Sequence, residues 1–259
     1  MNSTEINSKK ITISPEIAEI CGIHAGDGYL RNDGQRREWD ISGAIEEREY
    51  YDRHVIPLFN KVFKLHIKGR FFPSRYTYGF VIRDRKTIEF AHDMLGFPYG
   101  NKTLKVEVPS FILKDISLMT YFLRGYFDTD GHLGFAKRYG LYSEFKRTRH
   151  CYPRLMFTTV SYPLSRHLQN MFKIMEFNFV SYTYRPKKRS ENLKYRFDIN
   201  GVNNLRRWLD LIGIKNPTKY SRFLVWAKYG FCPVGTTCIQ RRNILKGELL
   251  PSVFYGPIV

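Results

Sequence analysis

The sequence predicts an α+β protein of two similar halves, each an αββαββα unit in which an antiparallel sheet carries helices on one face. The order of predicted helices and strands in residues 15–96 recurs in residues 118–213. Matching residues in the two halves also keep a nearly constant spacing, as expected for an internal repeat. Of the 259 residues, 43% are hydrophobic and 16% are aromatic, which suffices for a core and excludes wholesale disorder.

The first half begins after residues 1–14, a polar stretch expected to form a loose leader. Helical spacing of apolar residues starts at Pro15 and stops at Asp27-Gly28. A turn at residues 32–34 joins strands 29–31 and 38–42. Residues 46–63 form an amphipathic helix that Pro57 is expected to kink. A second hairpin (65–72 and 76–82) and a helix (85–95) complete the half.

The second half repeats this order. A helix over residues 118–129 ends at Asp130-Gly131, and strands 132–135 and 154–160 flank a long basic insertion. Helix 165–177, strands 179–184 and 193–199, and helix 202–212 follow. One more helix, 221–229, precedes an irregular end. We expect a leader (1–14), a first repeat (15–115), a second repeat (116–230) and a tail (231–259).

The spacing of matching residues tests the repeat. Three pairs lie 103 residues apart: Gly22 and Gly125, Asp27 and Asp130, Leu30 and Leu133. Phe59 and Phe172 lie 113 apart, and two later pairs lie 117 apart, namely Tyr78 with Tyr195 and Gly96 with Gly213. The spacing changes only where the second half has longer loops, which is the behaviour of a duplicated unit.

Glycines inside the first helix of each half predict that these two helices pack closely. Gly22 precedes Gly26 by four positions, and Gly125 precedes Thr129 by four. Glycine within a helix costs about 1 kcal/mol relative to alanine. Small residues offset that cost where two backbones must approach each other. We therefore expect the two helices to pack on each other about a pseudo-twofold axis.

Each of these helices ends in Asp-Gly. Glycine there is common, but a carboxylate faces the partial negative charge of the helix end. If the two helices are adjacent, Asp27 and Asp130 also repel each other. Two such carboxylates in a basic protein suggest a divalent cation, and hard oxygen ligands favour Mg²⁺, with Mn²⁺ or Ca²⁺ as substitutes.

Charge and composition limit the partners. Lys and Arg number 42 against 24 Asp and Glu, a formal net charge of +18, which favours a polyanionic partner. We expect nucleic acid rather than a membrane surface, because no basic amphipathic helix with an apolar face is present. The four cysteines are scattered and the start of the chain is polar, so we expect a cytoplasmic or organellar protein rather than a secreted one.

The segments ICGIHAGDG (20–28) and LRGYFDTDG (123–131) resemble the two motif copies of monomeric LAGLIDADG homing endonucleases. The stretch LIGIKNP (211–217) is similar to the end of the second repeat in archaeal-type members. The resemblance implies two saddle-shaped four-stranded sheets seated in the DNA major groove. It also implies a site-specific endonuclease that cuts double-stranded DNA at a long asymmetric site, in an intron-encoded or free-standing protein.

The resemblance also implies roles for the motif residues. Asp27 and Asp130 would each bind metal and direct hydrolysis of one strand, with the carbonyls of Gly26 and Thr129 assisting. Asp128 would be structural. The family usually places a Lys or Gln at the end of the second strand of each half, but residues 42–45 and 158–161 contain none. Arg83 could supply a basic group in the first half.

Basic residues at hairpin tips and on strands are the expected DNA contacts, binding phosphates or reading base edges. In the first half they are Arg31, Gln35, Arg36, Arg37, Arg70, Arg75 and Arg83. In the second half they are Lys137, Arg138, Lys146, Arg147, Arg149, Arg185, Lys187, Lys188, Arg189, Lys194 and Arg196. The denser basic runs predict more phosphate contacts from the second half. Two alternatives remain, an intron-RNA maturase and a DNA-binding regulator, and both would bind without cutting.

Overall fold

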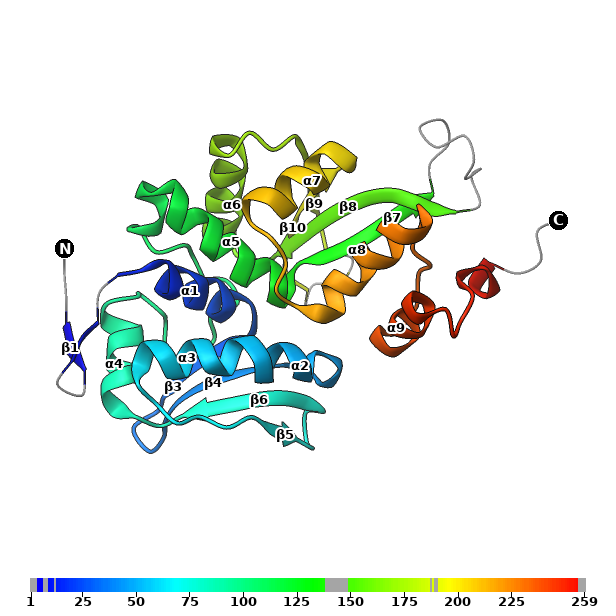
Figure 1. The fold of residues 1–259 in the computed structure, drawn as a ribbon. Helices are drawn as coiled ribbons and strands as arrows, with labels where there is room; N and C mark the ends of the chain where they lie inside the picture. Colours follow the sequence, from blue (N-terminus) through cyan, green and yellow to red (C-terminus); the bar gives the residue numbers. More distant parts are fainter. Residues whose placement is uncertain are drawn as a thin grey trace.

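The computed structural model describes residues 4–6, 9–11, 13–137, 149–186, 188 and 191–255. It contains two four-stranded antiparallel sheets with the strand orders β3-β4-β6-β5 and β7-β8-β10-β9. Helices pack against one face of each sheet, and α1 and α5 lie side by side between the two halves (Figure 1). The predicted α+β fold of two similar halves is confirmed.

The first half contains α1 (Pro15–Asp27), β3 (Gly28–Asn32), β4 (Arg37–Ala44), η1 (Ile45–Glu47), α2 (Arg48–Tyr50), η2 (Tyr51–Val55), α3 (Ile56–Phe63), β5 (Arg70–Phe72), β6 (Thr77–Ile82) and α4 (Arg85–Asp93). The predicted helix over 46–63 is present but irregular. It opens with the 3₁₀ turn η1, and the π-helical turn η2 directly precedes α3. Pro57 in the first turn of α3 has no N–H to donate, which accounts for the irregularity at this point.

The second half contains η3 (Ile112–Lys114), α5 (Ile116–Asp130), β7 (His132–Lys137), β8 (His150–Thr159), α6 (Tyr162–Ile174), β9 (Phe179–Tyr184), β10 (Lys194–Asn200), α7 (Val202–Leu211) and α8 (Pro217–Tyr229). The predicted helix 221–229 starts four residues earlier, because Asn216 accepts the Thr218 N–H and caps it. Within the described ranges, no helix is long and apolar enough to cross a membrane.

Both ends of the chain are more ordered than the sequence predicts. A hairpin of β1 (Thr4–Ile6) and β2 (Lys9–Ile11) occupies part of the expected leader. Helix α9 (Cys238–Lys246) and the 3₁₀ segment η5 (Pro251–Tyr255) lie in the expected irregular tail. A Thr237–Gln240 capping box begins α9 and the left-handed Gly247 ends it, so this helix carries ordinary start and stop signals.

Aromatic clusters on the helix-covered face of each sheet form the core. In the first half Phe59 packs on Trp39 and Phe80, with ring centroids 5.2 and 5.0 Å away. In the second half Phe172 packs on Phe157 and Phe197 at 5.0 and 5.9 Å. Phe59 with Phe172 and Phe80 with Phe197 are repeat-equivalent pairs, so the duplication extends to the packing of the core.

The crossing of α1 and α5 depends on its glycines. A Cβ added at Gly22 would overlap the Phe122 carbonyl oxygen and lie 2.7 Å from the Tyr126 nitrogen. A Cβ added at Gly125 would overlap the Glu19 carbonyl oxygen in the same way. The helix backbones are therefore in direct contact, which brings the C-terminal ends of the two helices together.

The C-terminal helices link the two halves. Asn216 donates to the Glu47 carboxylate at 2.7 Å, and the Thr218 hydroxyl donates to the Glu46 carbonyl at 3.1 Å. From α9, the Cys238 N–H donates to the Glu46 carboxylate, and Arg242 pairs with Glu49. These contacts hold the segment that follows β4 against the second half.

Alanine at Gly22 or Gly125 is expected to destabilise the protein by about 2 kcal/mol or more, although alanine normally favours a helix by about 1 kcal/mol. The physical reason is the overlap of the new Cβ with the facing backbone. Chemical denaturation of each variant measures the effect. Gly34→Ala is the control, because no atom lies within 4 Å of its Cβ position and only the strain of φ +85° applies. Equal stability of the parent and the Gly22→Ala variant would contradict the close crossing.

Candidate functional site

Asp27 and Asp130 are the last residues of α1 and α5, and the crossing brings them to one place. A Cβ added at Gly26 would lie only 3.3 Å from the Asp130 carboxyl carbon. Burial and the nearby Asp130 carboxylate raise the pKa of Asp27 to about 7. The structure therefore places close together the two carboxylates that the motifs single out.

The Asp27 carboxylate lies in an enclosed environment. It accepts a hydrogen bond of 2.6 Å from the Tyr51 hydroxyl, which lies in η2. Glu47 contributes a further negative charge that raises the Asp27 pKa. Burial raises the pKa of Glu47 itself, whereas Lys219 and the hydrogen bond from Asn216 lower it. The two carboxylates pack closely against the backbone of Gly43, because a Cβ there would lie 2.6 Å from Asp27 Oδ2 and 3.2 Å from Glu47 Oε2.

The Asp130 side chain is more open to solvent than Asp27. Loss of hydration from the atoms packed around it raises its pKa, and the positive charges of Lys102 and Lys219 lower it. Leu164 stands 113 residues after Tyr51, the spacing that relates the two equivalent helices, and its side chain cannot donate a hydrogen bond. The two halves of the site are therefore chemically different.

Two lysines bind the C-terminal carbonyls of the motif helices. Lys102 Nζ donates to the carbonyls of Ala25 at 2.9 Å and Gly26 at 2.7 Å, and also to that of His24. Lys219 Nζ donates to the carbonyls of Phe127 at 2.8 Å and Thr129 at 2.5 Å. The C-terminal end of a helix carries a partial negative charge that repels a nearby aspartate. The two ammonium groups offset this negative charge.

Sequence reasoning missed these lysines, although a signal was available. Lys219 follows Lys102 by 117 residues, the same spacing that relates Gly96 to Gly213. The expected position for a lysine was the end of the second strand of each half. Both lysines instead lie after the last strand of their half, so that expectation did not point to them. Burial lowers the pKa of Lys102 to about 8, against the opposing effect of the Asp130 and Asp27 carboxylates. Burial also lowers the pKa of Lys219, which the nearby carboxylates in turn raise.

The other motif residues have structural contacts. Asp128 is buried, and its Oδ2 accepts the Lys215 N–H at 2.8 Å, so it fixes the turn before α8. Burial raises the Asp128 pKa to about 7. His24 is buried, stacks on Phe97 at 3.8 Å and accepts from Trp39 at 3.0 Å, and burial lowers its pKa well below the ordinary value.

The predicted DNA contacts of the first half are largely paired with acids. Four ion pairs involve them: Arg31–Asp33 at 2.5 Å, Arg37–Glu89 at 3.4 Å, Arg75–Asp40 at 2.8 Å and Arg83–Glu38 at 2.9 Å. Gln35 and Arg36 are exposed at the β3–β4 turn, and Arg70 stacks on Phe72. Arg83 pairs with Glu38, and its role in place of the missing strand-end lysine stays a prediction.

The second-half contacts are divided between several environments. Lys137, Arg185, Lys188 and Lys194 are exposed. Arg149 stacks on Phe231 and Tyr255, and Arg196 makes a bidentate pair with Asp198 at 2.6 and 3.0 Å. Arg138, Lys146, Arg147, Lys187 and Arg189 lie outside the described residues.

The donor set at the helix ends suits a hard cation. The Asp27, Glu47 and Asp130 carboxylates supply oxygen donors. Gly43 lets the Asp27 and Glu47 carboxylates approach its backbone closely, and Gly26 does the same for Thr129 and Asp130. Among the described residues, no group of three or more His, Cys, Asp or Glu side chains already has a geometry that could hold a metal. The Gly26 and Thr129 carbonyls, expected to assist a metal, accept hydrogen bonds from the two lysines.

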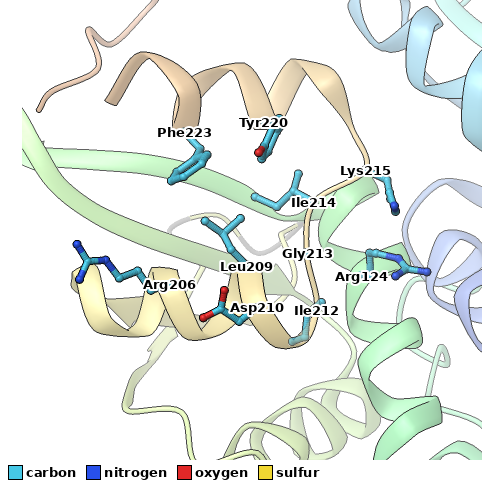
Figure 2. A pocket seen from close by; sticks show the side chains of 10 residues that line it. All are labelled: Arg124, Arg206, Leu209, Asp210, Ile212, Gly213, Ile214, Lys215, Tyr220 and Phe223. Atoms are coloured by element: carbon cyan, nitrogen blue, oxygen red, sulfur yellow. The ribbon is translucent and has the colours of Figure 1, made fainter. Parts of the chain in front are cut away.

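A cavity of about 550 Å³ lies elsewhere, between α5, α7 and α8. In Figure 2, Leu209, Ile214 and Phe223 face its centre, while Arg206 and Arg124 lie at opposite ends. None of the predicted site residues lines it. Arg124 is engaged with Glu19 across the helix crossing at 2.5 Å. This cavity is therefore separate from the paired aspartates.

Comparison with known proteins agrees with the fold and the motifs. Residues 117–213 match the family model of a LAGLIDADG-like domain. Two structures of the homing endonuclease I-DmoI are similar at 14% identity: the complex with DNA and Mn (TM-score 0.52, covering 78% of this chain and 98% of that one) and the complex with DNA and Ca (TM-score 0.50, covering 76% and 88%).

Among curated proteins, a replication factor C small subunit of Methanocaldococcus jannaschii is 28% identical over 212 residues. The match covers 81% of this chain but only 10% of that protein's length. The second half thus matches a LAGLIDADG-like domain, and the fold of the chain is similar to that of I-DmoI. The domain match and the shared fold support the assignment of this chain to the LAGLIDADG family, and the family predicted from the motifs is confirmed.

Asp27→Asn is expected to make metal-free stability less dependent on pH. Because the folded-state pKa of Asp27 is raised from 3.8 to about 7, its contribution to stability is fully present below pH 3.8 and is lost as the pH rises through 7. Asp27→Asn loses less of its free energy of unfolding over this pH range. At pH 7.5 its free energy of unfolding should therefore equal that of the parent or exceed it by about 1 kcal/mol. Thermal melts with a chelator between pH 4 and 8 measure this.

Tyr51→Phe is the opposite-sign control for that experiment. It removes the hydrogen bond that lowers the Asp27 pKa, so the loss of stability should move to higher pH. If the melting temperatures of the parent and Asp27→Asn change with pH in parallel, Asp27 does not have the raised pKa described above.

Proposed function

We propose that this protein is a divalent-metal-dependent DNA endonuclease that hydrolyses one strand of a specific duplex site at each motif aspartate. The observation that carries the proposal is the convergence of Asp27 and Asp130 at the ends of two crossing helices, between two antiparallel sheets. The net charge of +18 suits a polyanionic duplex, and the similar I-DmoI structures contain DNA with Mn or Ca.

In this proposal Asp27 and Asp130 hold Mg²⁺, and the Glu47 carboxylate adds negative charge on the side of Asp27. The bound cation would lower the pKa of a water molecule and stabilise charge on the leaving oxygen. Lys102 and Lys219 have a separate role. Their ammonium groups are held by helix carbonyls, and both interact electrostatically with Asp27 and Asp130. Without contacting the cleaved phosphate directly, they would stabilise the negative charge that develops on it.

Cleavage of supercoiled plasmid tests the roles of the aspartates. The plasmid carries a site selected by the protein from random-sequence DNA. Asp27→Asn and Asp130→Asn should each cut one strand and leave nicked circles, if each aspartate serves one strand. The double variant should bind DNA but cut neither strand. Complete linearisation by the double variant would exclude the proposed site, and binding without cutting by the parent would favour the DNA-binding regulator.

The same assay tests the lysines. Lys102→Met and Lys219→Met should each lower the cleavage rate by about 100-fold or more, because a fixed positive charge near the phosphate is lost. DNA affinity should change far less. Lys246→Met, at the exposed end of α9, is the matched control and should cut like the parent. Unchanged rates for both site variants would remove the lysines from the mechanism.

Binding to long duplex DNA should fall steeply with salt, with a log–log slope of at least about −5, because phosphate contacts release counterions. Fluorescence anisotropy between 50 and 300 mM KCl, with unrelated duplexes of equal length, measures the slope. A flat response would contradict a nucleic-acid partner of any kind.

A further inference from the structure

A basic pocket lies on the face of the second sheet opposite its aromatic core, and one of its lining residues, His132, follows Asp130 by two positions. Its volume is about 430 Å³, and the residues that form it come from the whole length of β7, from β8, from α8 and from the segment 232–235 after α8. The polar and charged side chains that line it are His132, Lys137, His150, Arg154 and Arg222. None of the described lining residues carries a carboxylate.

The C-terminal segment is fixed in place against this face. The Cys232 N–H donates to the His150 carbonyl at 3.0 Å, and the Trp226 indole donates to the Cys151 carbonyl at 2.7 Å. Pro233, Val234 and Gly235 then form one wall of the pocket. Residues beyond the repeated unit therefore complete a surface that the repeat alone would leave open.

Positive charge gathers in this pocket, because Lys137, Arg154 and Arg222 line it from β7, β8 and α8. Three further cations, Lys219, Arg241 and Arg196, lie near His132, one of the lining residues. Arg196 is neutralised by Asp198, and Arg241 and Lys219 are held by carbonyl or hydroxyl groups of the protein. The Nε of Arg154 is buried and has no hydrogen-bond partner among the described residues. The two guanidinium groups that line the pocket are therefore those of Arg222 and Arg154, and the exposed Lys137 adds a third positive charge.

The first half lacks this feature at the same register positions. In the first sheet Tyr29 pairs with Asp40 and Arg31 with Glu38. In the second sheet the equivalent pairs are His132 with Met156 and Gly134 with Arg154. Two acids on the first sheet are therefore replaced by methionine and arginine on the second. The positive pocket is a property of the second half and its C-terminal segment alone.

We propose that this pocket binds a phosphate of the DNA backbone through Arg222 and Arg154. The phosphate would lie near the DNA strand that Asp130 is proposed to cut. The inference rests on the proposed DNA partner and extends it, because it gives the C-terminal segment a direct part in positioning the duplex. Guanidinium groups donate two hydrogen bonds to a phosphate in a fixed geometry, which suits such a role. The contact positions DNA without reading its sequence.

Duplex binding by the full chain tests the proposal. Arg222→Gln and Arg154→Gln should each weaken binding to all sequences by roughly tenfold at low salt and reduce the magnitude of the salt slope by about 1. Arg222→Lys keeps the charge and should restore most of the slope. Arg206→Gln, on α7 and lining the separate cavity of Figure 2, is the matched control and should behave like the parent.

The outcomes distinguish this inference from the proposed function. If the parent protein does not bind DNA, both the endonuclease proposal and the phosphate-pocket proposal are contradicted. Normal DNA binding by the two folded glutamine variants, checked by thermal melts, would overturn the phosphate site and leave the endonuclease proposal intact. If inorganic phosphate raises the melting temperature of the parent while these variants bind DNA normally, the pocket accepts a free anion and the proposal is also overturned.

Discussion

The close crossing of α1 and α5 is the constraint on which the site depends. Gly22 and Gly125 allow backbone contact, and that contact brings the two C-terminal helix ends together. Two aspartates and two sets of unpaired carbonyls then share a small volume, which alone would be electrostatically unfavourable. Lys102 and Lys219 bind those carbonyls, so the fold offsets part of the negative charge, while burial still raises the pKa of both carboxylates.

The sequence was sufficient for the features that repeat locally. Helical periodicity, Asp-Gly stops and hairpin turns predicted both sheets, and the spacing of Gly22 and Gly125 predicted the crossing. The convergence of Asp27 and Asp130 followed from that crossing. Where the helix over 46–63 departs from regularity, Pro57 had already marked the position. These predictions succeeded because each rests on short-range chemistry that tertiary contacts reinforce.

Features set by long-range contacts were not predictable in the same way. Lys102 reaches α1 from 76 to 78 residues away, and Lys219 reaches α5 from 90 to 92 residues away. The ion pairs of Arg75 and Arg83 with strand acids likewise require the register of the sheet. Helix α9 was missed for a different reason, since its capping signals are present but its few apolar residues give no strong periodicity. The difference between the halves also emerges from packing, since the Tyr51 hydroxyl donates to Asp27 while Leu164 at the equivalent position cannot donate to Asp130.

The most direct test of the account is the position of the metal ion relative to the two helix ends. Crystals of the full chain with a duplex selected from random-sequence DNA, grown in Mn²⁺, would reveal the ion by anomalous scattering. The account predicts manganese bound by the Asp27 and Asp130 carboxylates between the ends of α1 and α5. Manganese bound elsewhere, with both carboxylates free of it, would contradict the assignment of this crossing as the catalytic centre.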